Sequence, residues 1–275
     1  MDLAGKTAVI TGGATGIGFA LAKQLGKAGA RIILFEPRET RLQEACDALG
    51  SEQIDAKYVA GDVTSADDLE ALVDFVWSEN GRADLLIANA GVGGGQAKGL
   101  KADLDAARAL YDVNFWGVWA SIQAFGRRWS QEEKPASAYA VASENALFNA
   151  LPFGGGGYVS SKHAVFGLMD TLRRDAPDWL TLGVILPGWV KSELSEANKT
   201  IPAAMDTDEY AEIIAPQIAA GEYYIVSHGY NMVRFDERYD ELREAFNKYA
   251  PREEGDDQYD VQKFFAKMMA ERNKS

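Results

Sequence analysis

The sequence predicts an α/β domain whose single parallel β-sheet is doubly wound and covered by helices on both faces, giving three layers. Short apolar runs rich in β-branched residues alternate with helix-length amphipathic stretches along the chain. The apolar runs are continuous, as is typical of strands that are buried on both faces of a parallel sheet. No linker rich in Pro, Gly and Ser divides the 275 residues. Right-handed crossovers then produce the doubly wound order.

The elements follow one another in regular alternation. We expect strands over 8–10, 31–35, 57–60, 85–88, 138–142, 181–186 and 223–226. We expect helices between these strands, near 16–28, 39–49, 66–79, 103–130, 158–175 and 208–220. Strands that alternate with helices of this length are typical of successive βαβ units.

The C-terminal part of the chain is predicted to be a helical extension. A long amphipathic helix is expected from about residue 234 to 249, and we place the end of the single domain at residue 250. The tail, residues 251–275, begins with the acidic hinge Arg252-Glu-Glu-Gly-Asp-Asp-Gln258 and ends in an amphipathic segment over 261–272. Such a run of charged residues with a glycine is typical of a solvated connection.

Composition narrows the possible partners and the compartment. The chain has 28 Lys and Arg against 41 Asp and Glu, a net charge of −13, which argues against nucleic acid because affinity for a phosphate backbone needs clustered basic residues. Cys46, His163 and His228 do not form a pattern of metal ligands, so we expect no metal. The sequence begins with no signal-peptide pattern and has no apolar run near the roughly 20 residues that cross a bilayer. We therefore expect a cytoplasmic protein without a membrane partner.

A glycine-rich turn joins the first strand to the first helix. It reads Thr11-Gly-Gly-Ala-Thr-Gly-Ile-Gly18. Glycine permits a tight turn and lets the backbone approach a pyrophosphate, while the start of the following helix offers free N–H groups and a positive dipole. A plain glycine-rich turn is the alternative. The position directly after an N-terminal strand favours dinucleotide binding by a Rossmann-type sheet.

Glu36 closes the second strand, where a dinucleotide-binding domain carries its acidic residue. A carboxylate at this place accepts hydrogen bonds from the adenosine ribose hydroxyls and repels a 2′-phosphate. Arg38 weakens this argument, since an arginine two positions further on can reach such a phosphate. The alternative is that Glu36 caps the next helix. We expect NAD, with NADP less favoured.

A tyrosine and a lysine lie four residues apart in a predicted helix and therefore share one face of it. A free phenol has a pKa of about 10, too high for a base near neutrality. The ammonium group of Lys162 is expected to lower the pKa of Tyr158 toward a useful range for acid–base catalysis. On its own such a pair is commonly a surface feature. Ser143, which precedes Tyr158 by about 15 residues at the end of a predicted strand, favours a catalytic role.

In these motifs the sequence resembles the short-chain dehydrogenase/reductase family, in its shorter, non-extended form. The resemblance covers residues 3 to about 230. Its motifs, in order along the chain, are the turn at 11–18, Asp62-Val63, Asn89-Ala-Gly91, Asn114, Ser143, Tyr158-Val-Ser-Ser-Lys162 and Pro187-Gly188. Each motif alone is weak, whereas all of them in order and at the expected strand ends are specific.

The resemblance implies a catalytic group of four residues. Ser143 would bind the substrate oxygen, Tyr158 would transfer the proton, Lys162 would hold the nicotinamide ribose, and Asn114 would bind a water molecule that continues the proton relay. The residues implied to bind the cofactor are Thr11, Gly12, Thr15, Gly16, Ile17, Gly18, Glu36, Asp62, Val63, Asn89, Ala90, Gly91, Tyr158, Lys162, Pro187, Gly188, Val190 and Ser192.

Two departures from the family pattern concern the substrate side. The gap from Ser143 to Tyr158 is a residue or two longer than usual, and Glu144-Asn145 stands where small or apolar residues are commoner. These two side chains either line the substrate site or point into solvent. The residues that we expect at the substrate are Ser143, Asn145, Phe153, Tyr158 and Trp189. Aromatic side chains near the pocket suit a flat apolar alcohol or ketone, but they can equally belong to the core or to a contact between subunits.

The stretches 186–194 and 222–251 also resemble, less specifically, the Cα-dehydrogenases that oxidise the benzylic alcohol of lignin-derived β-aryl ethers. We therefore predict an NAD-dependent oxidoreductase that interconverts a secondary alcohol, with a bulky aryl alcohol as the leading candidate, and its ketone. One alternative is an NADP-dependent carbonyl reductase on the same fold. Another is a nucleotide-sensing or scaffold protein without chemistry. The family resemblance further implies a homodimer or homotetramer formed through the helices near 103–130 and 158–175.

Overall fold

The computed structural model describes residues 2–94, 99–151, 154–192 and 204–272. It divides into two units, residues 1–229 and residues 230–275. The sequence analysis placed the end of the domain near residue 250, and that boundary stays a prediction. Phe153 lies outside the described residues.

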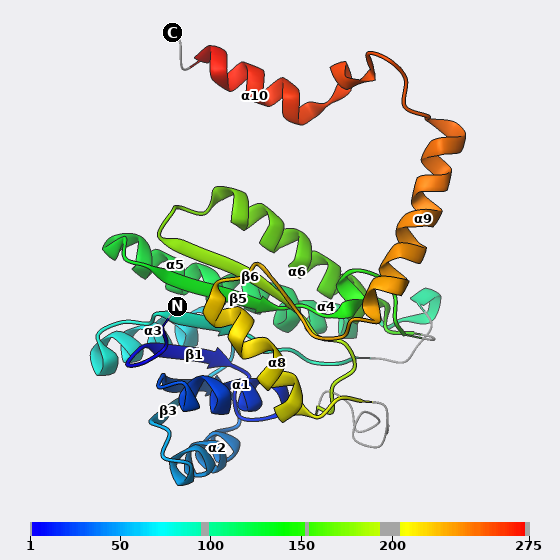
Figure 1. The fold of residues 1–275 in the computed structure, drawn as a ribbon. Coiled ribbons are helices and arrows are strands. Elements are labelled where there is room, and N and C mark those ends of the chain that lie inside the picture. The colour runs from blue at the N-terminus through cyan, green and yellow to red at the C-terminus, as the bar shows by residue number, and fades with distance from the viewer. Residues whose placement is uncertain (1, 95–98, 152–153, 193–203, 273–275) are drawn as a thin grey trace. The chain divides into compact units, whose positions relative to one another are not determined.

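The first unit contains the predicted sheet (Figure 1). In the described residues seven strands form one parallel sheet in the order β3-β2-β1-β4-β5-β6-β7. Each strand pairs in parallel with its neighbours, as expected for a doubly wound α/β fold. The strands are β1 (Thr7–Thr11), β2 (Arg31–Glu36), β3 (Ala56–Ala60), β4 (Leu85–Ala88), β5 (Ala136–Val141), β6 (Leu180–Leu186) and β7 (Tyr224–Val226). The predicted fold class is confirmed.

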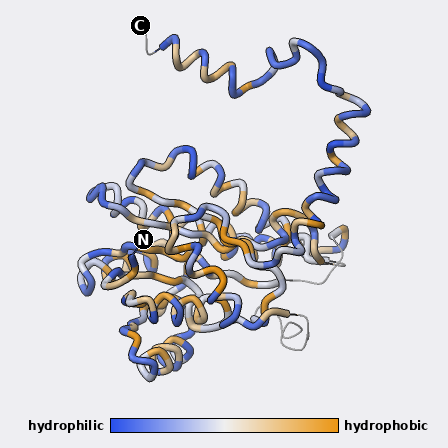
Figure 2. Tube along the Cα trace, viewed as in Figure 1, coloured by the Kyte–Doolittle hydropathy of each residue, from blue (hydrophilic) through white to orange (hydrophobic). Residues whose placement is uncertain are grey.

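Helices cover both faces because successive side chains of a strand point to opposite sides. Ala8 and Ile10 of β1 pack in the core that includes side chains of α1, α2 and α8, whereas Val9 packs in the core with α3, α5 and α6. The central strands are accordingly the most hydrophobic part of the unit (Figure 2). The helices that follow the strands are α1 (Gly16–Lys27), α2 (Glu39–Ser51), α3 (Ala66–Asn80), α4 (Leu104–Tyr111), α5 (Val118–Glu132), α6 (Gly156–Asp175) and α8 (Thr207–Ala220).

The structure differs from the sequence prediction in the long helix expected over 103–130. A π-helical turn over Asp112–Gly117 separates α4 from α5. The side chain of Asn114, in the middle of this turn, is fully buried and hydrogen bonds to the backbone of Val92. Wide turns of this kind often occur at functional sites. Here the wide turn directs a polar side chain into the carboxyl edge of the sheet.

The second unit consists of helices. It contains α9 (Asn231–Tyr249), a 3₁₀ turn (Asp256–Tyr259) and α10 (Val261–Arg272). None of the residues in these three elements, all of which the structure describes, is buried. Among the described residues we find no helix with the length and apolarity needed to span a membrane.

Candidate active site

The predicted site residues gather at one edge of the sheet because four of the strands that carry them are neighbours. β1, β4, β5 and β6 are adjacent in the sheet and parallel, so the turns after their carboxyl ends lie side by side. The backbone N–H of Glu144, after β5, donates to the carbonyl of Pro187, after β6, at 2.7 Å. In open α/β sheets this edge is where ligands bind.

The glycine-rich turn is packed too closely for side chains at two of its glycines. Gly12 has a φ of +60°, and a Cβ atom there would lie 2.9 Å from the Cα atom of Ala90. A Cβ atom on Gly18 would lie 2.4 Å from the carbonyl oxygen of Gly12 and 2.6 Å from Nδ2 of Asn89. All three separations are shorter than those that Cβ atoms make with non-bonded atoms in proteins. Glycine at 12 and 18 therefore allows the turn, α1 and the end of β4 to approach one another.

Asn89 and Thr11 brace this turn. Nδ2 of Asn89 donates to the carbonyl oxygens of Thr11 and Gly12, each at 2.9 Å. The hydroxyl of Thr11 in turn accepts hydrogen bonds from the backbone N–H groups of Asn89 and Ala90, each at 3.0 Å. Both side chains thus hold the ends of β1 and β4 in register, which leaves the backbone of the turn to meet a ligand.

The start of α1 fits the pyrophosphate of a dinucleotide. The helix begins at Gly16, and Thr15 in the N-cap position makes no side-chain capping hydrogen bond with any described residue. The first turn carries no acidic side chain, so the N–H groups and the positive end of the helix dipole remain available to an anion. Thr15, Gly16 and Ile17 are all partly exposed. A Cβ atom on Gly16 would meet only Ser192, at 3.4 Å, among the described atoms, so this side of the turn is open.

Glu36 is held in place by its neighbour Arg38. The Glu36 side chain is 4% exposed, and its two oxygens accept hydrogen bonds from Nε and Nη2 of Arg38 at 2.7 and 3.2 Å. This two-point pairing is the strong geometry for arginine and a carboxylate. The alternative that Glu36 caps α2 is not supported, because the N-cap position of that helix is Arg38.

The remaining predicted cofactor residues border the same edge. Asp62 accepts a hydrogen bond from the backbone of Thr64 at 2.9 Å, and Val63 is buried. Ala90 and Gly91 follow β4, and both are partly exposed. Val190, after β6, forms an isolated parallel bridge with Met205 that fixes the backbone of this turn.

His228 is a residue near the site that the sequence analysis did not select. A Cβ atom on Gly188 would lie 2.5 Å from the imidazole ring of His228, so the ring packs flush against this glycine. Burial lowers the pKa of His228, which keeps the ring neutral near pH 7. A neutral ring in this place supports the Pro187–Val190 turn by packing. In the sequence, this packing is indicated by Gly188 just after β6 and His228 just after β7.

Tyr158, Lys162 and Ser143 meet where α6 crosses the end of β5. The Nζ atom of Lys162 lies 5.7 Å from the centre of the Tyr158 ring and donates to the carbonyl oxygen of Val141 at 2.9 Å. A hydrogen bond joins the hydroxyl of Ser143 to the phenol of Tyr158. Ser143 and Lys162 are 5% and 4% exposed. Tyr158 is partly exposed, so these three residues form one polar group that is buried on the side of Ser143 and Lys162.

The acid–base balance of this group differs from the sequence expectation. Burial raises the pKa of Tyr158 above its ordinary value, the charge of Glu144 raises it further, and only the hydrogen bond with Ser143 lowers it. Burial also lowers the pKa of Lys162 to about 8. The expected lowering of the tyrosine pKa was therefore wrong for the protein by itself, because burial penalises the charged phenolate. Tyr158 is protonated at neutral pH.

Asn145 sets the direction of the Ser143 hydroxyl. The backbone N–H and Nδ2 of Asn145 approach Oγ of Ser143 at 3.1 and 3.3 Å, and Oδ1 of Asn145 accepts from the backbone of Ala150 at 3.0 Å. A hydroxyl has two acceptor positions and one proton to donate. With both acceptor positions used, Ser143 is left to donate toward Tyr158 or a substrate oxygen. Asn145 is 5% exposed and therefore does not point into solvent.

Asn114 and Ser161 complete the polar group. Oδ1 of Asn114 accepts from the backbone N–H of Val92 at 2.7 Å, and Nδ2 donates to the Val92 carbonyl and to Oγ of Ser161. Ser161 is fully buried and donates to the carbonyl of Tyr158 at 2.8 Å. A Cβ atom on Gly91 would lie 3.3 Å from Oδ1 of Asn114 and 3.5 Å from Nζ of Lys162, so both atoms face this glycine. Ser161 lies inside the motif around Tyr158 but was not among the site residues predicted from the sequence.

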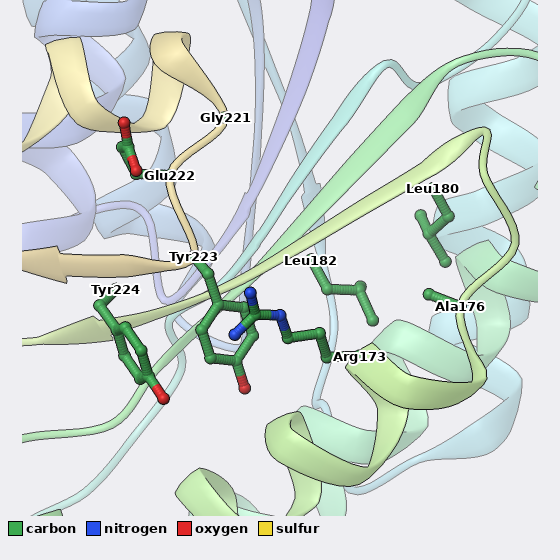
Figure 3. A pocket seen from close by; sticks show the side chains of 8 residues that line it. All are labelled: Arg173, Ala176, Leu180, Leu182, Gly221, Glu222, Tyr223 and Tyr224. Carbon is green, nitrogen blue, oxygen red and sulfur yellow. The ribbon is translucent and has the colours of Figure 1, made fainter. Parts of the chain in front are cut away.

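Of the other predicted substrate residues, Trp189 is 46% exposed, next to the turn after β6. Figure 3 shows a separate pocket at the opposite end of the sheet, lined by the starts of β6 and β7 and the end of α6. In this pocket the guanidinium carbon of Arg173 lies 4.0 Å from the centre of the Tyr223 ring. None of the residues that line it belongs to the predicted site, and it lies where the parallel strands begin.

A doubly wound sheet with a glycine cradle for a pyrophosphate, and a partly exposed tyrosine with a buried lysine and serine beside it, defines a dinucleotide-dependent oxidoreductase. Residues 6–202 match the family described as short chain dehydrogenase. The chain belongs to the short-chain dehydrogenase/reductase family, whose members use NAD or NADP. It is an oxidoreductase of the type that interconverts secondary alcohols and ketones.

Known proteins resemble the chain over most of its length. The 1-deoxy-11-beta-hydroxypentalenate dehydrogenase of Streptomyces avermitilis is 28% identical over 249 residues, which cover 88% of this chain and 92% of that protein. The apo form of LigO from Sphingobium sp. strain SYK-6 has a TM-score of 0.81 at 26% identity and covers 98% of both chains. An alcohol dehydrogenase of the archaeon Thermococcus sibiricus, solved with 5-hydroxy-NADP, has a TM-score of 0.70 at 28% identity and covers 78% of this chain and 90% of its own.

Gly18→Ala tests the close packing of the cradle. We expect the dissociation constant for NAD or NADP to rise at least about tenfold, because the added methyl group displaces Gly12 and Asn89 from the turn. Cofactor fluorescence titration measures it. Gly50→Ala is the matched control, since a Cβ atom there meets nothing within 4 Å, and it should bind cofactor as the original chain does. Unchanged affinity in Gly18→Ala would contradict this account of the turn.

Proposed function

We propose that this protein is an NAD-dependent oxidoreductase that interconverts a bulky secondary alcohol and its ketone, with Ser143, Tyr158, Lys162 and Asn114 as the catalytic group. The observation that carries this proposal is the contact of the buried Ser143 with Tyr158 beside the Lys162 ammonium. It lies at the carboxyl edge of the sheet next to the glycine cradle. A nucleotide sensor or scaffold without chemistry would have no need to bring these three polar groups together.

The reacting oxygen is served by two side chains with different tasks. When bound, the nicotinamide donates or accepts a hydride, and its oxidised form adds a positive charge to the site. Ser143 donates a hydrogen bond to the substrate oxygen, since Asn145 already occupies its acceptor positions. Tyr158 gives its proton to the same oxygen as negative charge develops there during reduction. The raised pKa of Tyr158 keeps that proton available at neutral pH.

Lys162 and Asn114 lie on the cofactor side of the site. They would bind the ribose and the water molecule through which Tyr158 exchanges its proton. The Nζ atom of Lys162 is anchored on Val141 and retains donors for the ribose hydroxyls. Oδ1 of Asn114 and Nζ of Lys162 both face Gly91, which is a suitable place for a water molecule shared between them. In the direction of oxidation Tyr158 must first lose its proton. The positive charges of Lys162 and of an oxidised cofactor favour that loss.

The choice of NAD over NADP rests on Glu36. Its carboxylate stands at the end of β2, almost fully buried, and would repel a 2′-phosphate. Arg38 is already engaged by two hydrogen bonds to Glu36 and must break them to reach such a phosphate. The relative from Thermococcus sibiricus, solved with an NADP derivative, keeps an NADP-dependent carbonyl reductase as the second candidate.

A bulky aryl secondary alcohol is the proposed substrate class. Residues 186–194 and 222–251 resemble the Cα-dehydrogenases of β-aryl ethers, and LigO, a lignin Cα-dehydrogenase, is similar over 98% of this chain. The exposed indole of Trp189 stands beside the cofactor turn, where an aromatic ring can pack on it.

We further propose that subunits associate through α5 and α6. The stacked Trp116 and Trp119, 54% and 37% exposed, support an apolar contact at the start of α5.

Tyr158→Phe tests the chemistry directly. Turnover should fall at least about a hundredfold, the lower end of general acid–base contributions, while NADH still binds. The measurement is NADH absorbance in a screen of aryl and aliphatic secondary alcohols. Tyr224→Phe, on the exposed edge strand β7, is the control and should retain full activity. A fully active Tyr158→Phe variant would refute the proposal, and turnover confined to small polar alcohols would refute the aryl substrate.

Glu36→Ala tests the choice of cofactor. Removing the carboxylate ends the repulsion and removes the two hydrogen bonds that hold Arg38 on Glu36, so the ratio of kcat/KM for NADP to that for NAD should rise about tenfold or more. Steady-state kinetics with both nucleotides measures this ratio. The double variant Glu36→Ala with Arg38→Ala separates the two effects, because it should lose most of the gain in NADP use. A ratio that stays constant in Glu36→Ala would show that this residue does not select the nucleotide.

A further inference from the structure

Helix α9 carries an apolar stripe along its length. The stripe consists of Met232, Phe235, Tyr239, Leu242, Phe246 and Tyr249, which recur at alternating spacings of three and four residues. Five of them are between 44% and 76% exposed, and Phe235 is half-buried against Tyr239, with 4.3 Å between ring centres. Such spacing is that of the a and d positions of a two-stranded coiled coil.

An exposed helix of this kind needs a partner. None of the 19 residues of α9, all of them described, is buried. Most of the stability of helices in proteins comes from packing of an apolar face rather than from helix propensity. Six large apolar side chains in a row also exceed the scattered exposure that is normal for a protein surface.

The stripe fits a second copy of itself in the antiparallel direction. When two α9 helices run in opposite directions, an a position of one faces a d position of the other. Tyr239 then faces Leu242 of the second copy, Phe235 faces Phe246, and Met232 faces Tyr249, so every member of the stripe is used. We propose that α9 joins two copies of this chain as an antiparallel helix pair with two-fold symmetry.

The charges beside the stripe select this direction. Asp236 and Arg243 occupy the e positions, and in an antiparallel pair each e position faces an e position of the other helix. Asp236 of each copy then faces Arg243 of the other, which gives two attractive pairs. In a parallel pair Arg238, a g position, would instead face Arg243, which is repulsive. Arg243 now pairs with Asp240 of its own helix, an exposed contact that contributes little and exchanges readily.

This surface is distinct from the proposed contact through α5 and α6. A protein with both contacts would associate through two different two-fold interfaces, as closed tetramers do. The inference rests on α9 alone and does not depend on the substrate, the cofactor or the catalytic group.

Cross-linking between two single-cysteine variants tests the pairing. Asp236→Cys and Arg243→Cys, each in full-length protein with Cys46→Ser, are mixed and treated with a short thiol-reactive cross-linker. We expect a covalent dimer that contains one chain of each variant, formed at least about tenfold faster than in the control mixture. The control is Glu237→Cys with Glu244→Cys, which has the same spacing on the opposite face of α9. Equal or absent cross-linking, as in a parallel pair or in docking of α9 on its own chain, would overturn the proposal.

Sedimentation of charge-reversal variants tests the direction of the α9 pair independently. Arg243→Asp opposes Asp236 in the antiparallel pair, so the dissociation constant of the association should rise about tenfold. Adding Asp236→Arg restores opposite charges and should restore the association. A parallel pair predicts the reverse for Arg243→Asp, since the new carboxylate would attract Arg238. Stronger association, or an association that neither variant changes, would contradict the antiparallel arrangement.

Discussion

A lysine ammonium inside the protein is the feature on which the site depends most. Nζ of Lys162 is removed from solvent and is held by the carbonyl of Val141 at 2.9 Å. That hydrogen bond ties α6 to the end of β5 and thereby brings Tyr158 to Ser143. Burial of a charged group is unfavourable, and here it lowers the lysine pKa to about 8. The fold keeps this destabilising group at the point where charge develops during the proposed reaction.

The order of the strands explains why residues far apart in sequence meet around this lysine. β1, β4, β5 and β6 are neighbours, so the turns after them form one edge, and the missing side chains of Gly12 and Gly18 let those turns approach. The π-helical turn then directs Asn114 toward Gly91 and Lys162. The dinucleotide cradle and the proton donors are thus two parts of one edge, which is the geometry that hydride transfer coupled to proton transfer requires.

Much of this arrangement was predictable from the sequence, because continuous apolar strands and glycine spacing are local signals. The strands and the cradle follow from them, whereas the pairing of Ser143 with Tyr158 was expected from the resemblance to the family. Features that depend on distant contacts were not predictable: the π-helical turn arises from bonds between Asn114 and Val92, and the role of Asn145 arises from the path of the chain to Ala150. The pKa of Tyr158 was misjudged because spacing reveals a neighbouring ammonium and not the extent of burial.

The most direct test of the central claim is the pH dependence of the free energy of unfolding of Lys162→Met against the original chain. The pKa of Lys162 is about 8 in the folded chain and 10.5 when the side chain is in water. Between these pH values the unfolded chain binds more protons than the folded chain. The free energy of unfolding of the original chain therefore rises with pH across that window. Below pH 8 the full penalty of the buried charge is present. We predict that Lys162→Met is more stable by about 1–2 kcal/mol at pH 7, after allowing for the lost hydrogen bond to Val141, and that its advantage disappears toward pH 10.5. A variant that is no more stable at pH 7, or whose difference is the same at every pH, would contradict the account.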